Sequence, residues 1–332
     1  MNNKIKLVFL IIFAQFLSGC TSIGSYIISN PDVYLSEAEF IKAKPEEIGF
    51  TKHEFCSHNS KECIQYLAAP PYLSENFPVG SSVYYNLHAV GNGVENTVSH
   101  TMTPDTFNRF KGTALLLHGY GGKKEVMIAT AIYFRALGMK VIIPDLFGHG
   151  ESQEKFAFGS KEHRVLSQLL SQLANKKGDK ELSVVVGHSM GTLTASNLIS
   201  SEYVDAAILL APMMRFDIAA KEYLPNKAPK LSSLFSDRVD DIVTHTMNEA
   251  SVTLEETDLL INLIESSKPA LLINSNVDSI SPPSYFSSVN NKQLTKLIFE
   301  NRAHSSLMVF SQKDASKIEK WLFGLSNHYN SS

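Results

Sequence analysis

The stretch Val184-Val185-Val186-Gly187-His188-Ser189-Met190-Gly191 decides the fold prediction, because it is typical of a buried strand that ends in a sharp turn into a helix. Its last five residues have the form G-x-S-x-G. A serine between such glycines takes a strained backbone conformation, which pushes its Oγ out above the end of the sheet. The pattern predicts that Ser189 is a nucleophile. It also predicts that the backbone N–H of Met190, at the start of the next helix, faces a developing oxyanion.

Five other runs share the apolar character of this strand and alternate with helical stretches. They lie at residues 114–118, 141–144, 206–210, 270–274 and 296–299. Near-continuous runs of leucine and β-branched residues are typical of strands that are covered on both faces. Their alternation with helices predicts an α/β protein with a doubly wound, mostly parallel sheet.

One long segment interrupts this alternation. Residues 213–267 have a helical pattern and contain no convincing strand. We interpret the segment as a helical lid rather than an elongated crossover, since it is much longer than one crossover helix requires. At its start, Met213, Met214 and Phe216 either line an acyl pocket or belong to the core.

Two polar residues follow later strands. Asp278 lies after the strand at 270–274, and His304 lies after the strand at 296–299. Because the carboxyl ends of parallel strands meet at one edge of the sheet, we expect both side chains beside Ser189. Acyl transfer by a serine needs a base that takes the hydroxyl proton and an acid that orients this base. These roles fall to His304 and Asp278.

A second oxyanion donor is expected in the loop after the strand at 114–118. This loop reads His118-Gly119-Tyr120-Gly121-Gly122, and its glycines let the backbone approach a substrate carbonyl closely. The backbone N–H of Tyr120 would then act together with that of Met190. Each such donor contributes about 3 kcal/mol of transition-state stabilisation.

Three motifs together resemble the α/β-hydrolase superfamily, and most closely its monoacylglycerol lipase and lysophospholipase-like branch. They are Gly187-His188-Ser189-Met190-Gly191, His118-Gly119-Tyr120-Gly121 and Pro144-Asp145-Leu146-Phe147-Gly148-His149-Gly150-Glu151-Ser152. The order serine, aspartate, histidine along the chain agrees with this resemblance. It implies an α/β-hydrolase fold with a helical lid and a serine hydrolase that cleaves carboxylic esters, with small acylglycerols or lysophospholipids as the leading substrates. The same branch also contains peptidases and carbon–carbon hydrolases.

The resemblance also assigns residues that chemistry alone would leave ambiguous. It implies that Asp145 shapes a loop and that Asp278 is the catalytic acid. It places His118, His149 and His188 at turn positions rather than in a metal cluster, so that no metal and no cofactor is expected. Thr192 departs from the family pattern, which usually has a second glycine there.

The N-terminus has the pattern of an export signal. Two lysines precede an apolar run, Leu7 to Leu17, which is too short to span a bilayer. The next residues, Leu17-Ser18-Gly19-Cys20, resemble the lipobox of bacterial lipoproteins. This resemblance implies a signal peptide at residues 1–19, acylation of Cys20 and, with Thr21 in place of aspartate, an outer-membrane protein that faces the periplasm. The alternatives are a plain secretory signal and an N-terminal anchor helix.

The other two cysteines, Cys56 and Cys63, lie close together in a polar stretch. After export into an oxidising compartment they can form a local disulfide. A zinc site with His53 and His58 is an alternative, although its spacing matches no usual pattern, and two free thiols are another. We assign residues 20–79 to a tether and an N-terminal extension, and residues 80–325 to the hydrolase domain.

Composition narrows the function classes. The 332 residues carry a formal charge of -3 and lack a basic stripe, which argues against a nucleic-acid partner. Two alternatives to an esterase remain open. An aminopeptidase would need an acidic group in the lid to bind a substrate amine, and the candidates are Glu249, Glu255, Glu256 and Asp258. A non-catalytic envelope protein would use the fold only as a binding scaffold.

Overall fold

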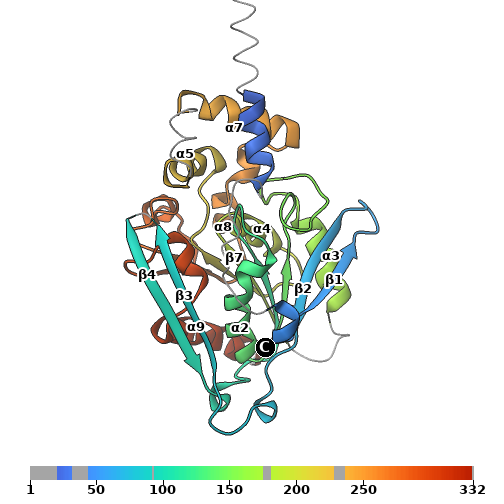
Figure 1. The fold of residues 1–332 in the computed structure, drawn as a ribbon, viewed down its shortest axis with the longest axis vertical. Helices are drawn as coiled ribbons and strands as arrows, with labels where there is room; N and C mark the ends of the chain where they lie inside the picture. The colour runs from blue at the N-terminus through green and yellow to red at the C-terminus, as the bar shows by residue number, and fades with distance from the viewer. Residues whose placement is uncertain (1–20, 32–43, 92, 175–180, 228–235, 331–332) are drawn as a thin grey trace, which may run out of the picture.

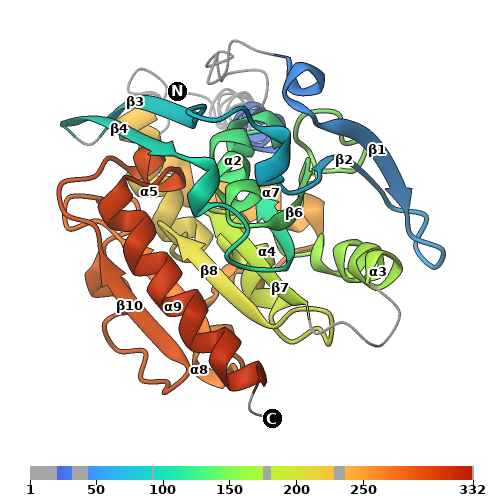
Figure 2. The same cartoon turned by 90° about the horizontal axis from the view of Figure 1, so that it is seen from below.

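The computed structural model describes residues 21–31, 44–91, 93–174, 181–227 and 236–330. Its centre is an eight-stranded sheet in the order β1-β2-β6-β5-β7-β8-β9-β10 (Figures 1 and 2). The strands are β1 (Thr51–Cys56), β2 (Cys63–Ala69), β5 (Gly112–Leu117), β6 (Met139–Pro144), β7 (Leu182–His188), β8 (Ala206–Leu210), β9 (Ala270–Asn274) and β10 (Leu294–Ile298). The six strands from β6 to β10 in this order run parallel to one another, whereas β2 runs antiparallel to both of its neighbours, β1 and β6. The prediction of a mostly parallel α/β sheet is confirmed.

Helices cover both faces of the sheet. Alternate residues of β5 point to opposite faces, so that Leu115 and Leu117 join one buried cluster and Ala114 and Leu116 join the other. The first cluster includes side chains of α3 (His163–Leu173) and α4 (Gly191–Leu198). The second includes side chains of α2 (Ile128–Ala136) and α9 (Gln312–Asn330). Burial on both faces explains why these strands are apolar throughout.

The segment between β8 and β9 is helical in its described part. It contains α5 (Phe216–Lys227), η6 (Ser236–Arg238), α7 (Val239–Ala250), η7 (Glu255–Thr257) and α8 (Leu260–Glu265). The helices α5 and α7 lie at the top of the molecule in Figure 1, beyond the carboxyl end of β7. The predicted helical insertion is therefore present, at the end of the sheet where Ser189 lies.

A hairpin lies outside the central sheet. Its strands are β3 (Val83–Gly91) and β4 (Val94–Met102), which pair only with each other. Tyr85, Leu87 and Ala89 of β3 are buried at every second position and belong to the same cluster as α2 and α9. The hairpin thus packs along one flank of the molecule (Figure 1). The remaining short helices are η2 (Pro45–Ile48), η3 (Ser74–Asn76), η4 (Pro104–Thr106), η5 (Lys124–Met127), η8 (Pro283–Phe286) and η9 (His304–Met308).

The expected boundary at residue 80 differs from the structure, since β1 and β2 precede it and extend the central sheet. Most of β1 is exposed, as befits an edge strand, and it therefore lacks the alternation that would have marked it. By contrast β2 is largely buried and pairs with β6, from Tyr66 opposite Pro144 to Ala69 opposite Val141. The part of the chain assigned to an extension therefore begins the hydrolase sheet.

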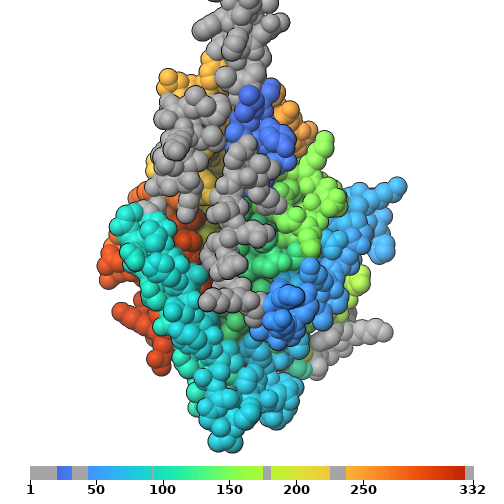
Figure 3. Space-filling view, in the orientation of Figure 1, coloured from blue at the N-terminus to red at the C-terminus, as the bar shows by residue number. Residues whose placement is uncertain are grey.

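Residues 21–29 form a helix that packs on the insertion. A Cβ built at Gly24 would lie 2.5 Å from Cδ1 of Ile242 in α7, so the two helices are in close contact. The hydroxyl of Ser25 donates to Oε2 of Glu249, at 2.5 Å. Figure 3 shows this helix, in blue, on the surface against orange atoms of the insertion. Within the described ranges, no helix is both long and apolar enough to cross a membrane.

Candidate active site

Ser189 lies in the sharp turn between β7 and α4. Its φ of 50° is in the left-handed region, which is strained for a residue with a side chain. Hydrogen bonds hold the turn on both sides of Ser189: its N–H donates to the carbonyl of Leu210 at 2.9 Å, and its carbonyl accepts from the N–H of Thr192 at 3.0 Å. Because a Cβ at Gly191 would lie 2.4 Å from the carbonyl oxygen of Leu117, only glycine fits there. This turn has the geometry that the G-x-S-x-G pattern predicts.

Asp278 and His304 form a buried pair. Oδ2 of Asp278 lies 2.7 Å from Nδ1 of His304. Oδ1 of Asp278 accepts from the backbone N–H groups of Ile280 at 3.0 Å and Ser281 at 3.3 Å. Burial alone would raise the pKa of Asp278, but the charge and hydrogen bond of His304 and these backbone donors hold the pKa below its usual value. The carboxylate is therefore ionised and accepts from Nδ1–H.

The opposite nitrogen of this imidazole has no hydrogen-bond partner among the described residues. Nε2 of His304 is buried and makes no hydrogen bond to any residue that the structure describes. With Nδ1 donating to Asp278, a neutral ring carries its acceptor lone pair on Nε2. That atom is thus ready to accept a hydroxyl proton.

His188 joins the histidine loop to the serine turn. Nε2 of His188, the residue next to Ser189, donates to the carbonyl of His304 at 3.1 Å. Burial, and then the neighbouring His304, lower the pKa of His188 to about 3, so its ring is neutral. The structure therefore brings together the loops that carry Ser189, Asp278 and His304.

The loop after β5 lies against the serine turn. A Cβ built at Gly119 would lie 3.0 Å from Cβ of Ser189. His118 holds the loop in place through both ring nitrogens. Its Nδ1 donates to the carbonyl of Gly119 at 2.8 Å, and its Nε2 accepts from the N–H of Leu146 at 3.0 Å. Tyr120 follows Gly119 in the chain, so the loop passes beside the turn that carries Ser189.

Asp145 takes no part in this arrangement. Its carboxylate accepts from the backbone N–H of Lys124 at 2.7 Å, from Nζ of Lys124 at 2.5 Å and from the N–H of Glu151 at 2.9 Å. Nζ of Lys124 also contacts Glu151 at 2.8 Å. Sequence reasoning missed Lys124 as the partner of Asp145, since nothing in the local pattern marks a lysine as buried.

The remaining predicted groups are placed as follows. Cys56 and Cys63 form a disulfide, and they face each other across the β1 and β2 pair. Within the described ranges, Glu54 and these two cysteines form the group of potential metal ligands that lie close together. However, sulfurs in a disulfide are not thiolates and do not bind zinc. Cys20 lies outside the described residues.

The insertion begins with apolar residues beside Ser189. The N–H of Met213 lies 3.3 Å from the carbonyl oxygen of Ser189. Met213, Met214 and Phe216 are buried in one cluster with side chains of α7. Phe216 packs edge to face on Phe158, with ring centroids 4.6 Å apart. The first residues of the insertion thus belong to the buried core, and Met213 lies beside the serine.

Several solved structures share the fold of this chain. The chain is similar to an esterase of Pyrococcus furiosus, with 16% identity, coverage of 85% of this chain and 95% of that one, and a TM-score of 0.57. It is also similar to a bacterial membrane phospholipase A described as a virulence factor, with 14% identity, coverage of 98% and 99%, and a TM-score of 0.52. A thermophilic esterase from Thermogutta terrifontis has 17% identity, coverage of 83% and 99%, and a TM-score of 0.51. At these identities the likeness shows the fold, which is that of an α/β-hydrolase.

The family follows from a sequence comparison. The family model described as serine aminopeptidase, S33 (Hydrolase_4) matches residues 108–284, just over half of the chain. The protein belongs to this family of hydrolases. No curated protein matches the chain in sequence.

Proposed function

We propose that the protein is a serine hydrolase that cleaves carboxylic esters, with small acylglycerols or lysophospholipids as its leading substrates. The observation that carries the proposal is the buried Asp278–His304 pair. Nε2 of His304 accepts no hydrogen bond from the residues that the structure describes, and its loop is bonded to the residue before the strained turn of Ser189. This arrangement supplies a nucleophile, a base and an acid that orients the base.

In the proposed mechanism, Nε2 of His304 takes the hydroxyl proton while Oγ of Ser189 attacks the ester carbonyl carbon. The backbone N–H groups of Tyr120 and Met190 stabilise the resulting oxyanion. His304 then returns the proton to the leaving alcohol, and the acyl group remains on Ser189. A water molecule, deprotonated by His304, attacks the acyl-enzyme and releases the carboxylic acid and the free serine.

The decisive test is the variant Ser189→Ala. The hydroxyl supplies chemistry and little packing, so the variant should fold and lose ester hydrolysis by several orders of magnitude. It should also fail to gain mass from a fluorophosphonate probe, whereas the wild type gains one adduct. Substantial turnover in purified Ser189→Ala would remove the mechanism.

Met213, whose N–H lies 3.3 Å from the carbonyl oxygen of Ser189, begins an apolar segment, which favours an acyl substrate. If the insertion closes over an acyl chain as a lid, each buried methylene gains up to about 0.8 kcal/mol, so catalytic efficiency should rise with chain length until the space is full. A series of esters from acetyl to dodecanoyl tests this. A flat profile would contradict an acyl-binding lid.

The family description favours one second candidate, an aminopeptidase. Its substrate amine would need an acidic partner, but Glu255 and Glu256 are exposed and Glu249 already accepts a hydrogen bond from Ser25. Oδ1 of Asp258 accepts from the N–H of Leu260 at 3.0 Å. We therefore favour the ester. Aminoacyl arylamides that outperform matched esters, and that lose this advantage when the amine is acetylated, would reverse the choice; no turnover of either would favour a binding scaffold.

We further propose that the mature chain is anchored in the outer membrane through an acylated Cys20 and faces the periplasm. The lipobox-like sequence supports this proposal. Intact-mass analysis of the wild type should give the mass of a chain that begins at Cys20 with acyl groups added, and Cys20→Ser should lack them. A mature wild type without acyl mass would remove the anchor.

A further inference from the structure

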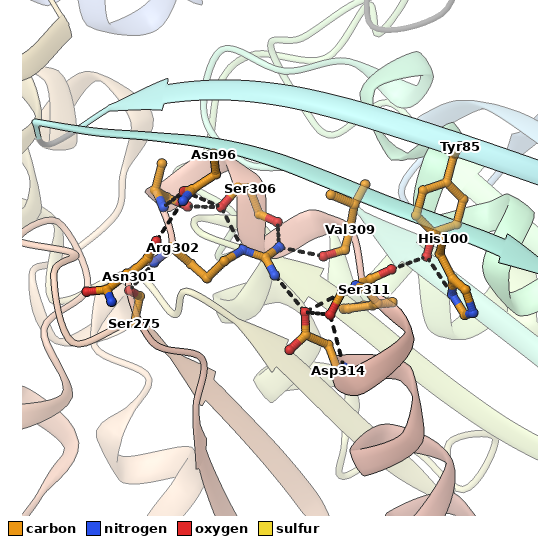
Figure 4. Close-up of polar contacts among 12 residues, drawn as sticks. Tyr85, Asn96, His100, Ser275, Asn301, Arg302, Ser306, Val309, Ser311 and Asp314 are labelled. Atoms are coloured by element: carbon orange, nitrogen blue, oxygen red, sulfur yellow. Dashed lines mark hydrogen bonds and ion pairs between the residues drawn. The ribbon is translucent and has the colours of Figure 1, made fainter.

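One side chain of the β3–β4 hairpin, which lies outside the central sheet, makes hydrogen bonds to the loop that carries His304. Asn96 of β4 reaches down to this loop in Figure 4. Its Oδ1 accepts from the backbone N–H of Ala303 at 2.5 Å, and its Nδ2 donates to the carbonyl of Asn301 at 2.7 Å. The hydroxyl of Ser306 lies 3.3 Å from the same Oδ1. A single amide therefore spans both sides of His304.

The far side of the loop is fixed by Arg302. Its guanidinium is buried and donates to Oδ2 of Asp314 in α9 at 2.6 Å and to the carbonyl of Val309 at 2.7 Å (Figure 4). Nε donates to the hydroxyl of Ser306 at 3.0 Å, and Nη2 also bonds the carbonyl of Ser306. The backbone N–H of Arg302 donates to Ser275 at 3.0 Å, which ties the loop to the strand end before Asp278.

These contacts leave the backbone around His304 little freedom. Asn96 holds the N–H of the preceding residue, and His188 holds the carbonyl of His304 itself. The position of the imidazole relative to Ser189 is thus set by a bond from the hairpin and a bond from the nucleophile turn. We propose that Asn96 is a positioning residue, which acts through the loop to place Nε2 of His304 at the serine. This inference rests on the proposed function.

Asn96 is a better probe than Arg302. Removing the guanidinium would leave the carboxylate of Asp314 buried without its positively charged partner, which destabilises the whole fold. Asn96 is only partly buried and lies on a hairpin that packs through other residues. Its loss should misplace the imidazole slightly while the fold persists. A displacement of about 1 Å can cost about 100-fold in rate.

The experiment compares Asn96→Ala and Asn96→Asp with the control Asn86→Ala, an exposed position on β3 of the same hairpin. Active sites are counted by fluorophosphonate titration, and kcat and KM are measured per active site on a short ester. We expect kcat of Asn96→Ala to fall about 10- to 100-fold with KM within about twofold, because ground-state binding does not use the imidazole. Asn96→Asp keeps the acceptor for Ala303 and should lie between wild type and alanine. The control should match the wild type.

A spectroscopic readout accompanies the kinetics. The low-field proton resonance of Nδ1–H of His304 should be sharp in the wild type and shifted or broadened in Asn96→Ala. A normal kcat per active site in Asn96→Ala, or a loss only of melting temperature or of titratable sites, would overturn the proposal. If the alanine variant does not fold, Asn96→Asp decides by the same criterion. Turnover that survives in Ser189→Ala would instead overturn the proposed function, so the two failures are distinct.

Discussion

The ammonium of Lys124 lies 2.5 Å from Oδ2 of Asp145, and both side chains are almost completely buried. Burial alone would lower the pKa of Lys124, but the charge of Asp145 and the hydrogen bonds to Asp145 and Glu151 raise the pKa above its usual value. Lys124 therefore stays protonated, and its bond to Asp145 joins the start of η5 to the end of β6. Two buried aspartates thus have different partners, a lysine for Asp145 and an imidazole for Asp278.

This difference predicts opposite effects for the same substitution at the two positions. Asp278→Asn should lose roughly 10³- to 10⁴-fold in kcat and little stability, because the amide no longer orients the imidazolium of His304. Asp145→Asn should lose up to about 3 kcal/mol of stability and keep most of its activity per folded molecule, since it leaves the buried Lys124 with only the more exposed Glu151 and Glu125 as counter-charges. Urea unfolding and active-site-normalised kinetics measure both. The acid would have to be assigned elsewhere if Asp278→Asn retained wild-type activity.

A second prediction concerns the close contact between Gly119 and Ser189. A methyl group at Gly119 would lie 3.0 Å from Cβ of Ser189 and 3.1 Å from Nδ1 of His188, closer than normal packing allows. Gly119→Ala should push the oxyanion loop away from the serine and lower kcat by about 100-fold, as expected when one donor is lost. Gly324→Ala is a matched control, because no atom lies within 4 Å of its Cβ position. Full activity in Gly119→Ala would show that this loop does not supply the oxyanion donor.

Glu162 predicts a pH dependence of stability. It is fully buried, Oε2 accepts from the N–H of Lys161 at 3.0 Å, and Oε1 has no partner in the described part of the chain. Burial raises the pKa of Glu162 from 4.5 to about 7. Between these pH values the native state keeps a proton that the unfolded state releases, so this group lowers stability as pH rises.

Glu162→Gln mimics the protonated form and should remove that slope. The free energy of unfolding of the variant minus that of the wild type should grow between pH 5 and pH 8, by about 3 kcal/mol at most. Urea titrations at four pH values in this range measure it. A difference that stays constant with pH would show that Glu162 is ionised throughout.

The disulfide between Cys56 and Cys63 predicts a change in stability without a change in catalysis. It closes a short loop with a sequence separation of 7, for which chain entropy predicts about 2.5 kcal/mol. In the sheet order β1-β2-β6-β5-β7, three strands lie between β1 and the strand before Ser189. The double variant Cys56→Ser and Cys63→Ser should therefore melt about 5 °C lower and keep its kcat and KM. A fall in kcat at temperatures where the variant is folded would contradict this separation.

The parallel strands and the turn after β7 could be predicted because the structural role of each residue there is visible in the local sequence. Apolar runs such as Leu115 to Leu117 are buried on both faces. Gly187 is required by contacts within the turn, and Gly191 by the closeness of the end of β5. The positions of Asp278 and His304 follow from the rule that strand ends share one edge. These parts of the fold and site depend on local sequence and on general sheet topology.

The parts that sequence reasoning missed depend on contacts between distant segments. The partner of Asn96 lies 207 residues away at Ala303, and no periodicity in either segment marks the pair. The hairpin itself left a weak signal, since Tyr85, Leu87 and Ala89 alternate with polar residues and the sequence Asn92-Gly93 is typical of a hairpin turn. Short alternating strands of this kind are outweighed by the stronger apolar runs.

The helix at residues 21–29 lies between the proposed lipid anchor and the candidate site along the chain. Tyr120, in the loop after β5, holds this helix by donating from its hydroxyl to the carbonyl of Ile28 at 3.0 Å. With a lipid on Cys20, the proposed anchor, the enzyme would be tethered to one bilayer. The enzyme would then sample molecules that diffuse in the plane of its own leaflet, and its rate would follow their mole fraction in the membrane rather than their bulk concentration.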